Sequence, residues 1–293
     1  MSLPEFFEAD HAVIEAALEK LLPPEGTQPP SIHRAMRYSV FAGGKRLRPV
    51  LCYESAQLFT EQLEPVIPVA CALEFIHTYS LIHDDLPALD NDDLRRGKAT
   101  CHKVFGDAIA ILAGDALLTL AFQTMADAPI EPAWRVRVIS EVGAGAGTVR
   151  GMVGGQVADL EAEGKPVTAD VLEYIHRSKT AALIRSAIVA GAIAGGAANE
   201  DVERLRRFGE HIGWAFQVVD DILDVEESSA ALGKTAGKDQ AQKKATYPAL
   251  YGIAKSREFA GELAAKALRE LDCYGARAKR LRDLAEFLVA RRS

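Results

Sequence analysis

Two groups of aspartates are the strongest chemical signal in the sequence. The first lies in residues 83–93, where five carboxylates fall within ten residues directly after the apolar segment 65–82. The second consists of Asp220, Asp221 and Asp224, which follow the apolar segment 213–219. Clustered carboxylates form an all-oxygen environment that suits Mg²⁺, which usually takes one or two carboxylates together with substrate phosphates. The two groups therefore predict a magnesium site that binds a phosphorylated substrate.

The spacing within each group allows its carboxylates to share a site. Asp84 and Asp90 would lie about 240° apart on an unbroken helix at ~100° per residue, but Pro87 is expected to interrupt the helix and to let Asp90 fold back. Asp220 and Asp224 are four residues apart, so they share one helical face. One such run alone could equally be a solvated helix end. Here there are two such runs, each at the end of an apolar segment and followed by a basic loop, and this combination favours a metal site. A di-iron bundle is disfavoured because the sequence lacks its Glu-x-x-His pairs.

Basic residues accompany both aspartate groups. The segment GGKRLRP at 43–49 combines a glycine turn with three cations at a helix start, where backbone N–H groups and the helix dipole also favour an anion. Arginine can hold a phosphate through two parallel hydrogen bonds, and lysine adds a mobile point charge. In isolation, a glycine helix end followed by solvated basic residues would give the same pattern. Arg95 and Arg96 follow the first aspartate group, Lys234 and Lys238 follow the second, and the pair Lys179 and Thr180 interrupts an apolar helix. Cations beside the aspartate groups predict a diphosphate substrate.

The elements that would carry these residues are helices. Apolar residues recur at helical spacing through most of the chain, and no alternating run bounded by turn signals predicts a β-hairpin. We therefore expect an all-α fold in which residues 1–293 form a single domain. Glycines crowd the region 143–155, where isolated helix propensity is poor, and we interpret them as sites of close helix packing.

Composition and charge narrow the class of protein. The 293 residues are 48% hydrophobic and 26% charged, as in ordinary globular proteins. The net charge of -7 argues against broad nucleic-acid binding, which requires a basic face. The four cysteines contain no CxxC pair, so they predict neither a zinc site nor a disulfide framework, and a reducing cytoplasm fits best. We expect no secretory leader and no membrane-spanning segment.

With its motifs in this order, the sequence resembles the short-chain trans-prenyltransferases of the polyprenyl synthetase family, and most closely the bacterial farnesyl diphosphate synthases. The similarity covers nearly the whole chain. It rests on five segments: GGKRLRP at 43–49, IHTYSLIHDDLPALDNDDLRRGKATCH at 76–102, the KT pair at 179–180, FQVVDDILD at 216–224 and LGKTAGKD at 232–239. The resemblance implies an isoprenoid-synthase-type helical bundle around a central cavity, with the two aspartate groups on facing helices at its mouth.

The resemblance also implies a role for each motif. The residues that would hold Mg²⁺ on the allylic diphosphate are Asp84, Asp90 and Asp220, supported by Asp85, Asp221 and Asp224. The residues that would grip the allylic diphosphate are Arg95, Lys179 and Lys234. Those that would bind the diphosphate of isopentenyl diphosphate are Lys45, Arg48, His77 and Arg96. Facing the reacting carbons would be Thr180 and Gln217, which complete an expected catalytic set with Lys179, Asp84 and Asp220.

The implied reaction joins isopentenyl diphosphate head to tail with dimethylallyl diphosphate and then geranyl diphosphate, giving farnesyl diphosphate and pyrophosphate. In synthases with this longer aspartate motif, an aromatic residue five positions before the first aspartate marks fifteen-carbon products. Tyr79 is therefore the expected floor of the product pocket, whereas periodicity alone would make it a core aromatic. Geranylgeranyl or geranyl diphosphate synthesis is the alternative. A terpene cyclase would not need the second diphosphate site, and a non-catalytic prenyl-diphosphate-binding subunit should have lost ligands. The family is usually homodimeric.

Overall fold

Helices form almost the whole of the described chain, which comprises residues 4–232 and 246–290 of the computed structural model. The first helices are α1 (Glu5–Leu21), α2 (Pro30–Val40), α3 (Leu47–Ala56), α4 (Ile67–Asp84), α5 (Cys101–Phe105), α6 (Asp107–Ala126) and α7 (Pro132–Ala146). They are followed by α8 (Met152–Ala162), α9 (Ala169–Ile175), α10 (Ala182–Ala194), α11 (Asn199–Leu232), α12 (Tyr247–Tyr251), α13 (Ile253–Glu270) and α14 (Lys279–Ala290). A π-helical turn, η2 (His176–Ala181), joins α9 to α10. The fold is all-α, as predicted.

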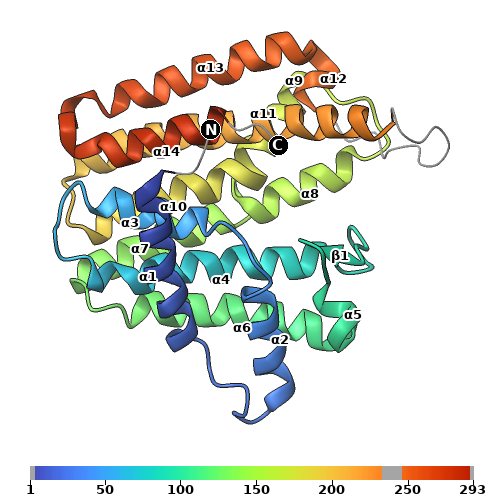
Figure 1. Ribbon diagram of the computed structural model, residues 1–293, viewed down its shortest axis with the longest axis vertical. Helices are drawn as coiled ribbons and strands as arrows, with labels where there is room; N and C mark the ends of the chain where they lie inside the picture. The colour runs from blue at the N-terminus through green and yellow to red at the C-terminus, as the bar shows by residue number, and fades with distance from the viewer. Residues whose placement is uncertain (1–3, 233–245, 291–293) are drawn as a thin grey trace.

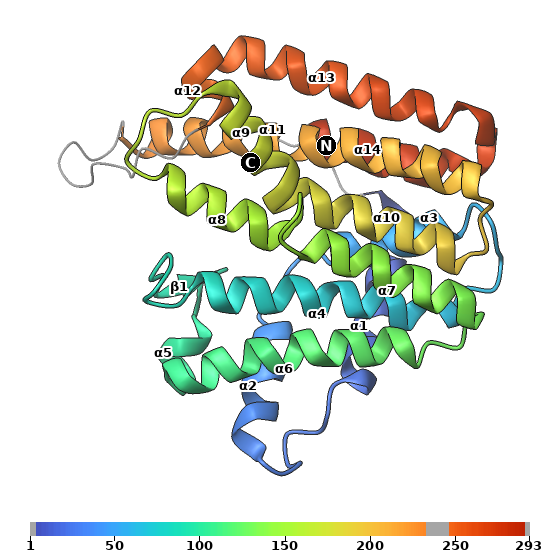
Figure 2. The same ribbon diagram turned by 180° about the vertical axis from the view of Figure 1, so that it is seen from behind.

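The bundle is organised around two buried helices, α4 and α10 (Figure 1). Every residue of α10 except Arg185 is buried, because the segment is built almost entirely from small and branched apolar residues. This helix packs on α3, α7 and α11, while α4 packs on α3 and α6. On the far side of α11, α13 runs alongside it (Figures 1 and 2).

The helices that carry the two aspartate groups reach the same end of the bundle. In Figure 1 this end lies on the right, where the strand β1 follows α4 and where α11 finishes; Figure 2 shows the same end from behind. Asp84 is the last residue of α4, and the second aspartate group lies in the C-terminal half of α11. The fold therefore places both predicted clusters at one end of the molecule.

A small β-hairpin, which the sequence pattern did not predict, follows the first aspartate group. β1 (Leu94–Arg95) pairs antiparallel with β2 (Lys98–Ala99). Arg96 (φ 53°) and Gly97 (φ 76°) both have positive φ, as a two-residue type I′ turn requires. The expectation of no hairpin was wrong because strands of two residues are too short to show an alternating pattern.

The glycine-rich region forms close helix contacts, as predicted. A Cβ atom at Gly145 would lie 2.1 Å from Ser186 Oγ on α10, and one at Gly155 would lie 2.2 Å from the backbone nitrogen of Lys179 in η2. No carbon can approach other atoms so closely, so a side chain at these positions would push the helices apart. Glycine is what lets α7 approach α10 and α8 approach η2.

Two helical segments, Glu64–Asp84 and Asp107–Ala126, are long and apolar enough to cross a membrane by length and composition, with mean hydropathies of 1.4 and 1.6. The core helix of a bundle passes the same test, and these two segments pack on each other. They differ in burial, since 67% of the first apolar window is buried and only 39% of the second. Helix α6 therefore keeps much apolar surface uncovered in the single chain.

Candidate active site

The first aspartate group is folded back on itself. Helix α4 ends at Asp84, and the backbone N–H of Asp90 donates to the carbonyl of Asp84 at 2.9 Å. The N–H of Asn91 donates to the carbonyl of Leu86 at 3.1 Å, so the chain closes a tight loop around Pro87. This is the return of Asp90 toward Asp84 that the proline predicted.

Asp84 lies in a buried environment shared with two other carboxylates and two cations. The pKa of Asp84 is raised to about 6, mainly by burial; Lys179 and Arg95 lower this pKa, and the neighbouring carboxylates Asp90 and Asp85 raise it. A divalent cation at this position would offset the repulsion, and carboxylate oxygens are the donors that Mg²⁺ prefers. Within the described ranges, no group of three or more Asp, Glu, His or Cys side chains lies close enough together to hold a metal ion.

Asp85 has a different environment from Asp84. It is buried and accepts two hydrogen bonds from Nε of Arg95, at 2.7 Å to Oδ1 and 2.9 Å to Oδ2. Burial raises the pKa of Asp85 and this contact with Arg95 lowers it. The pair ties the β-hairpin to the end of α4. Asp85 is therefore arranged as a support for the cluster, and Arg95 is held next to it.

The second aspartate group likewise contains one buried aspartate that is hydrogen-bonded to protein groups, next to aspartates that are more exposed. Asp221 is buried and accepts hydrogen bonds from Gln217 Nε2 at 3.2 Å and from the backbone N–H of Tyr247 at 2.9 Å. Nε2 of His176 lies 3.2 Å from Asp221 Oδ2. Both oxygens of Asp221 are thus occupied by protein groups, and the amide of Gln217, predicted to face substrate, is directed to Asp221. On either side of Asp221, Asp220 is half-buried and Asp224 is exposed.

Lys179 is positioned by a carboxylate that sequence reasoning missed. Its Nζ donates to Asp159 Oδ2 on α8 at 2.7 Å, and it also lowers the pKa of Asp84, which places its charge close to the first cluster. Thr180, the next residue of η2, is half-buried. Asp159 lies one turn after Gly155, the glycine on which Lys179 packs, so the glycine-rich segment was the available signal.

The second predicted diphosphate site is a basic pocket of about 540 Å³. It contains all four residues assigned to it, and its lining includes Gly43, Gly44, Lys45, Arg46, Arg48, Glu74, His77, Arg96, Phe216 and Phe287. Four of these residues are Lys or Arg and one is a carboxylate. The pocket therefore carries an excess of positive charge, as an anion site requires.

The pKa values of Arg48 and His77 reflect the burial and the excess of positive charge in the basic pocket. The pKa of Arg48 is lowered to about 10, mainly by burial; Glu74 and Asp220 raise this pKa, and Arg96 lowers it. Burial also brings the pKa of His77 well below its usual value, and Arg48 and Arg96 push it in the same direction. His77 is therefore neutral, so it can contribute a hydrogen bond but no charge. The effect of Asp220 on Arg48 shows that the basic pocket adjoins the second aspartate group.

Arg95 and Arg96 are consecutive in the hairpin but contact different predicted sites. Arg95 pairs with Asp85, whereas Arg96 donates to the carbonyl of Gly43 and lines the basic pocket. A Cβ at Gly44, whose φ is 132°, would lie 2.3 Å from the guanidinium of Arg96. The guanidinium is the end of a flexible side chain, so the restriction to glycine at this position comes from the φ of Gly44, which L side chains rarely adopt. The predicted ligand Lys234 lies outside the described residues.

Tyr79, the predicted product floor, is buried beside the first cluster. Its ring packs edge-on against His83 with centroids 5.7 Å apart, and His83 Nε2 lies 3.0 Å from the carbonyl of Ile111 on α6. Burial raises the pKa of Tyr79, and Asp84 adds to this, so the phenol lies within the field of the aspartate. The ring therefore occupies the seam between α4 and α6, below Asp84.

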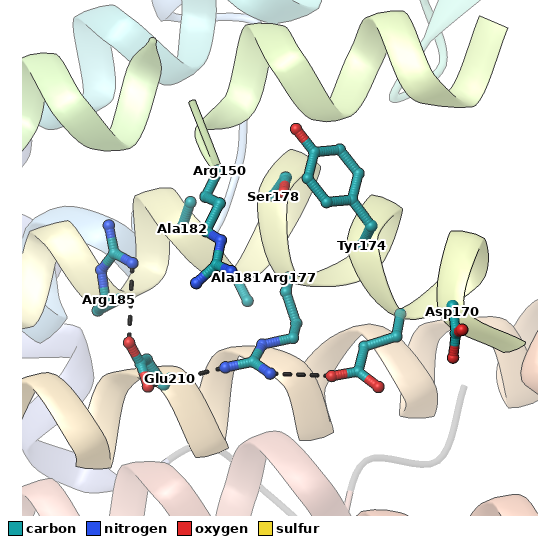
Figure 3. Close-up of a pocket in the computed structure, with 10 residues that line it drawn as sticks. Arg150, Asp170, Tyr174, Arg177, Ser178, Ala181, Ala182, Arg185 and Glu210 are labelled. Atoms are coloured by element: carbon teal, nitrogen blue, oxygen red, sulfur yellow. Dashed lines mark hydrogen bonds and ion pairs between the residues drawn. The ribbon is translucent and has the colours of Figure 1, made fainter. Parts of the chain in front are cut away.

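A further pocket of about 350 Å³ is lined by residues of α9, η2, α10 and α11, among them Tyr174, Ser178 and Glu210 (Figure 3). Its charged lining residues are Arg150, Arg177, Arg185, Asp170, Glu173 and Glu210. Arg177 pairs with Glu173 at 2.9 Å and lies 3.9 Å from Glu210, which is also 3.9 Å from Arg185. Three cations face three carboxylates, so this pocket lacks the positive excess of the basic pocket.

A helical bundle with two aspartate groups and an adjoining basic pocket has what an enzyme needs to join two diphosphate substrates. The chain belongs to the polyprenyl synthetase family, whose sequence profile matches residues 29–283. It is accordingly a prenyltransferase that elongates trans-prenyl chains.

Individual relatives are similar over most of their length. The chain is 47% identical to a farnesyl diphosphate synthase of Geobacillus stearothermophilus, covering 99% of this chain and 98% of that protein. It is 51% identical to a chloroplastic geranylgeranyl pyrophosphate synthase 7 of Arabidopsis thaliana, covering 91% and 78%. Among solved structures, an apo FPP/GFPP synthase from Zymomonas mobilis superposes with a TM-score of 0.86 at 38% identity, covering 97% and 98%. These relatives share the fold and differ in the product they are named for.

Proposed function

We propose that this prenyltransferase condenses isopentenyl diphosphate with dimethylallyl and then geranyl diphosphate, releasing pyrophosphate and forming farnesyl diphosphate. The observation that carries the proposal is the pair of adjoining anion sites. The cluster of Asp84, Asp90 and Lys179 suits a metal-bound diphosphate, while the basic pocket around Arg48 suits a diphosphate bound by side chains alone.

The reaction needs charge stabilisation more than it needs a nucleophilic side chain. Bound Mg²⁺ would neutralise the charge that develops on the departing pyrophosphate. Lys179 and Arg95 would add positive charge beside it as the allylic C–O bond breaks. The double bond of isopentenyl diphosphate, held through Arg48 and Lys45, would then form the new C–C bond to the allylic cation. A proton would leave to the released pyrophosphate, which completes a chain five carbons longer.

The metal assignment is tested by removing one ligand from each group. We expect Asp84→Ala and Asp220→Ala each to lower kcat by roughly 10²-fold or more, because each loses charge stabilisation of several kcal/mol. Asp93→Ala is the matched control, since Asp93 is an exposed aspartate of the same run that pairs with Lys103 at 2.7 Å. Full activity in excess chelator, or near-native turnover by the folded Asp84 and Asp220 variants, would contradict the assignment.

Product length rests on Tyr79. At ~1.5 Å rise per residue its five-residue separation from Asp84 places it ~7.5 Å deeper along α4, where the bulky ring supports a fifteen-carbon limit. The twenty-carbon alternative is favoured by similarity to geranylgeranyl pyrophosphate synthases at 51% identity. Incubation with Mg²⁺, isopentenyl diphosphate and each allylic diphosphate, followed by product analysis, decides between them.

The role of the Tyr79 ring can be separated from that of its hydroxyl. Tyr79→Ala should shift products to twenty carbons or longer, because the pocket gains depth. Tyr79→Phe keeps the ring and should retain the native product. An active Tyr79→Ala enzyme with an unchanged product would show that another residue closes the pocket.

A further inference from the structure

His176 forms a buried link between the two halves of the candidate active site. We propose that His176 is a positioning residue that fixes the second aspartate group, on α11, relative to η2, the turn that carries Lys179. The inference rests on the proposed function for its consequence but not for its geometry. The imidazole is 4% exposed and Asp221 is 5% exposed, and Nε2 lies 3.2 Å from Asp221 Oδ2.

The chemistry of the contact determines the tautomer of His176. An ionised carboxylate presents only lone pairs, so a proton on Nε2 makes the 3.2 Å contact with Asp221 favourable, whereas a lone pair on Nε2 would repel it. Nδ1 is buried and has no hydrogen-bond partner in the described part of the chain, as suits an unprotonated nitrogen. The ring packs on Tyr247, with centroids 5.2 Å apart and planes tilted by 36°, which further restricts its orientation.

One carboxylate thereby connects three segments that are far apart in the sequence. Asp221 lies on α11, His176 begins η2, and the N–H of Tyr247 at the start of α12 donates to Asp221 Oδ2 at 2.9 Å. Asp221 directly follows Asp220, a proposed metal ligand, and His176 precedes Lys179 by three residues. A shift of η2 relative to α11 would therefore change the separation between Lys179 and Asp220.

The π-helical form of η2 lets one turn make contacts in two directions. His176 contacts α11 through Asp221, while Lys179 contacts Asp159 on α8 at 2.7 Å. Between them, Arg177 stacks on the ring of Trp214 of α11 at 5.2 Å. π-helical turns are rare and occur frequently at functional sites. Here the turn is held on both sides, and His176 supplies the buried polar contact to α11.

Two substitutions separate the polar contact with Asp221 from the packing of the ring. Gln places its Nε2 near the position of the histidine Nε2, so His176→Gln retains a donor to Asp221. His176→Phe retains the ring against Tyr247 but leaves the buried carboxylate without this donor. We expect His176→Phe to lower kcat/KM for the allylic diphosphate about ten-fold or more and to raise the Mg²⁺ concentration needed for half-maximal rate, while His176→Gln stays within about three-fold. The control is His211→Phe, a half-buried histidine on α11 outside the site.

A measurement without substrate distinguishes this inference from the proposed function. In the substrate-free protein, the amide of Tyr247 should exchange with solvent faster in His176→Phe than in the native chain or in His176→Gln, because Asp221 loses one of its anchors. Nitrogen-15 NMR of histidine-labelled native protein should show His176 protonated at Nε2 and bare at Nδ1. This second measurement holds even if the Phe variant does not fold.

The possible outcomes are decisive in either direction. Selective loss in the Phe variant, with native-like behaviour in the Gln variant and Nε2 protonation, supports the proposal. Equal loss in both variants would assign the effect to the shape of the ring. Native kinetics and native Tyr247 exchange in the Phe variant, or a proton on Nδ1, would overturn the proposal. An inactive native enzyme that shows the predicted tautomer and exchange pattern would instead contradict the proposed function alone.

Discussion

Lys45 and Arg46 are neighbouring cations of the segment 43–49, but Arg46 is buried and Lys45 is exposed. Arg46 is buried and donates to Glu15 at 2.5 Å, to Glu74 at 2.9 Å and to the carbonyl of Val40 at 2.7 Å. Lys45 is exposed at the basic pocket and lies 5.9 Å over the ring of Phe287. A buried arginine with three acceptors stabilises the chain locally, whereas an exposed lysine remains available to an anion.

The two positions should therefore separate binding from stability. Lys45→Ala should raise KM for isopentenyl diphosphate about ten-fold with little change in kcat, because one charge-assisted phosphate contact is lost. Arg46→Ala should lower the free energy of unfolding by about 3–5 kcal/mol, since it leaves Glu74 buried without its partner. Steady-state kinetics and denaturant unfolding of both variants test this contrast. Reversed effects, with a stable Arg46 variant and an unfolded Lys45 variant, would mean that the environments are misassigned.

At the scale of elements, glycines decide how closely α8 approaches η2. Gly155→Ala would place a carbon 2.2 Å from the backbone nitrogen of Lys179, so we expect a loss of stability of about 1–3 kcal/mol and a lower kcat as Lys179 moves. Gly261→Ala on α13 is the matched control, because no atom lies within 4 Å of a Cβ there. It should stabilise the chain by about 0.5–1 kcal/mol, since alanine is the better helix former. Thermal unfolding and turnover of the two variants give the comparison.

A second element-scale feature joins α1, α3 and α14 through buried charge. Arg280 on α14 donates to Asp10 on α1 at 2.8 Å and lies 2.9 Å from Glu54 on α3. One guanidinium faces two carboxylates, and burial together with the hydrogen bond to Asp10 raises the pKa of Glu54 to about 9. The folded chain thus keeps a proton on Glu54 that the unfolded chain releases at much lower pH.

This raised pKa makes stability depend on pH in a defined direction. The contribution of protonated Glu54 is fully present below its ordinary pKa of 4.5 and is lost as pH rises toward about 9. Glu54→Gln cannot lose a proton, so its Tm should match the native Tm at pH 4 and exceed it increasingly between pH 6 and 9. Glu258→Gln, at an exposed position of α13, should show no such divergence. Parallel Tm curves for the Glu54 variant and the native chain would contradict a raised pKa.

At the scale of the whole molecule, α6 keeps apolar side chains exposed in the single chain. Its apolar window is only 39% buried, and Ile111 and Leu112 are 45% and 53% exposed. Exposed apolar side chains can mark a protein interface. We propose that two copies of the chain associate through α6.

The dimer proposal predicts a specific effect on mass. Leu112→Lys should shift the protein from dimer to monomer in sedimentation velocity, because a charge would be desolvated at the interface. Val13→Lys, at an exposed apolar residue on α1 (39% exposed), should leave the mass unchanged. A native chain that sediments as a monomer, or a Leu112 variant that stays dimeric, would rule out this interface.

The sequence by itself determined the fold class, the family and which residues group together in the two predicted diphosphate sites. Local patterns were enough for this, because helix periodicity, a proline break and clustered charges express their effects within a few residues, as the return of Asp90 to Asp84 shows. The tertiary structure decided which members of each motif can contact a ligand. The sequence does not show how the neighbouring cations Lys45 and Arg46, or the neighbouring aspartates Asp84 and Asp85, differ in environment. The partners that set them apart come from other segments: Glu74 and Glu15 bind Arg46, and Arg95 binds Asp85. The roles of Asp159 and His176 likewise depend on distant contacts: Asp159 contacts Lys179, 20 residues away, and His176 contacts Asp221, 45 residues away. Burial among distant segments is a property that no local sequence pattern contains.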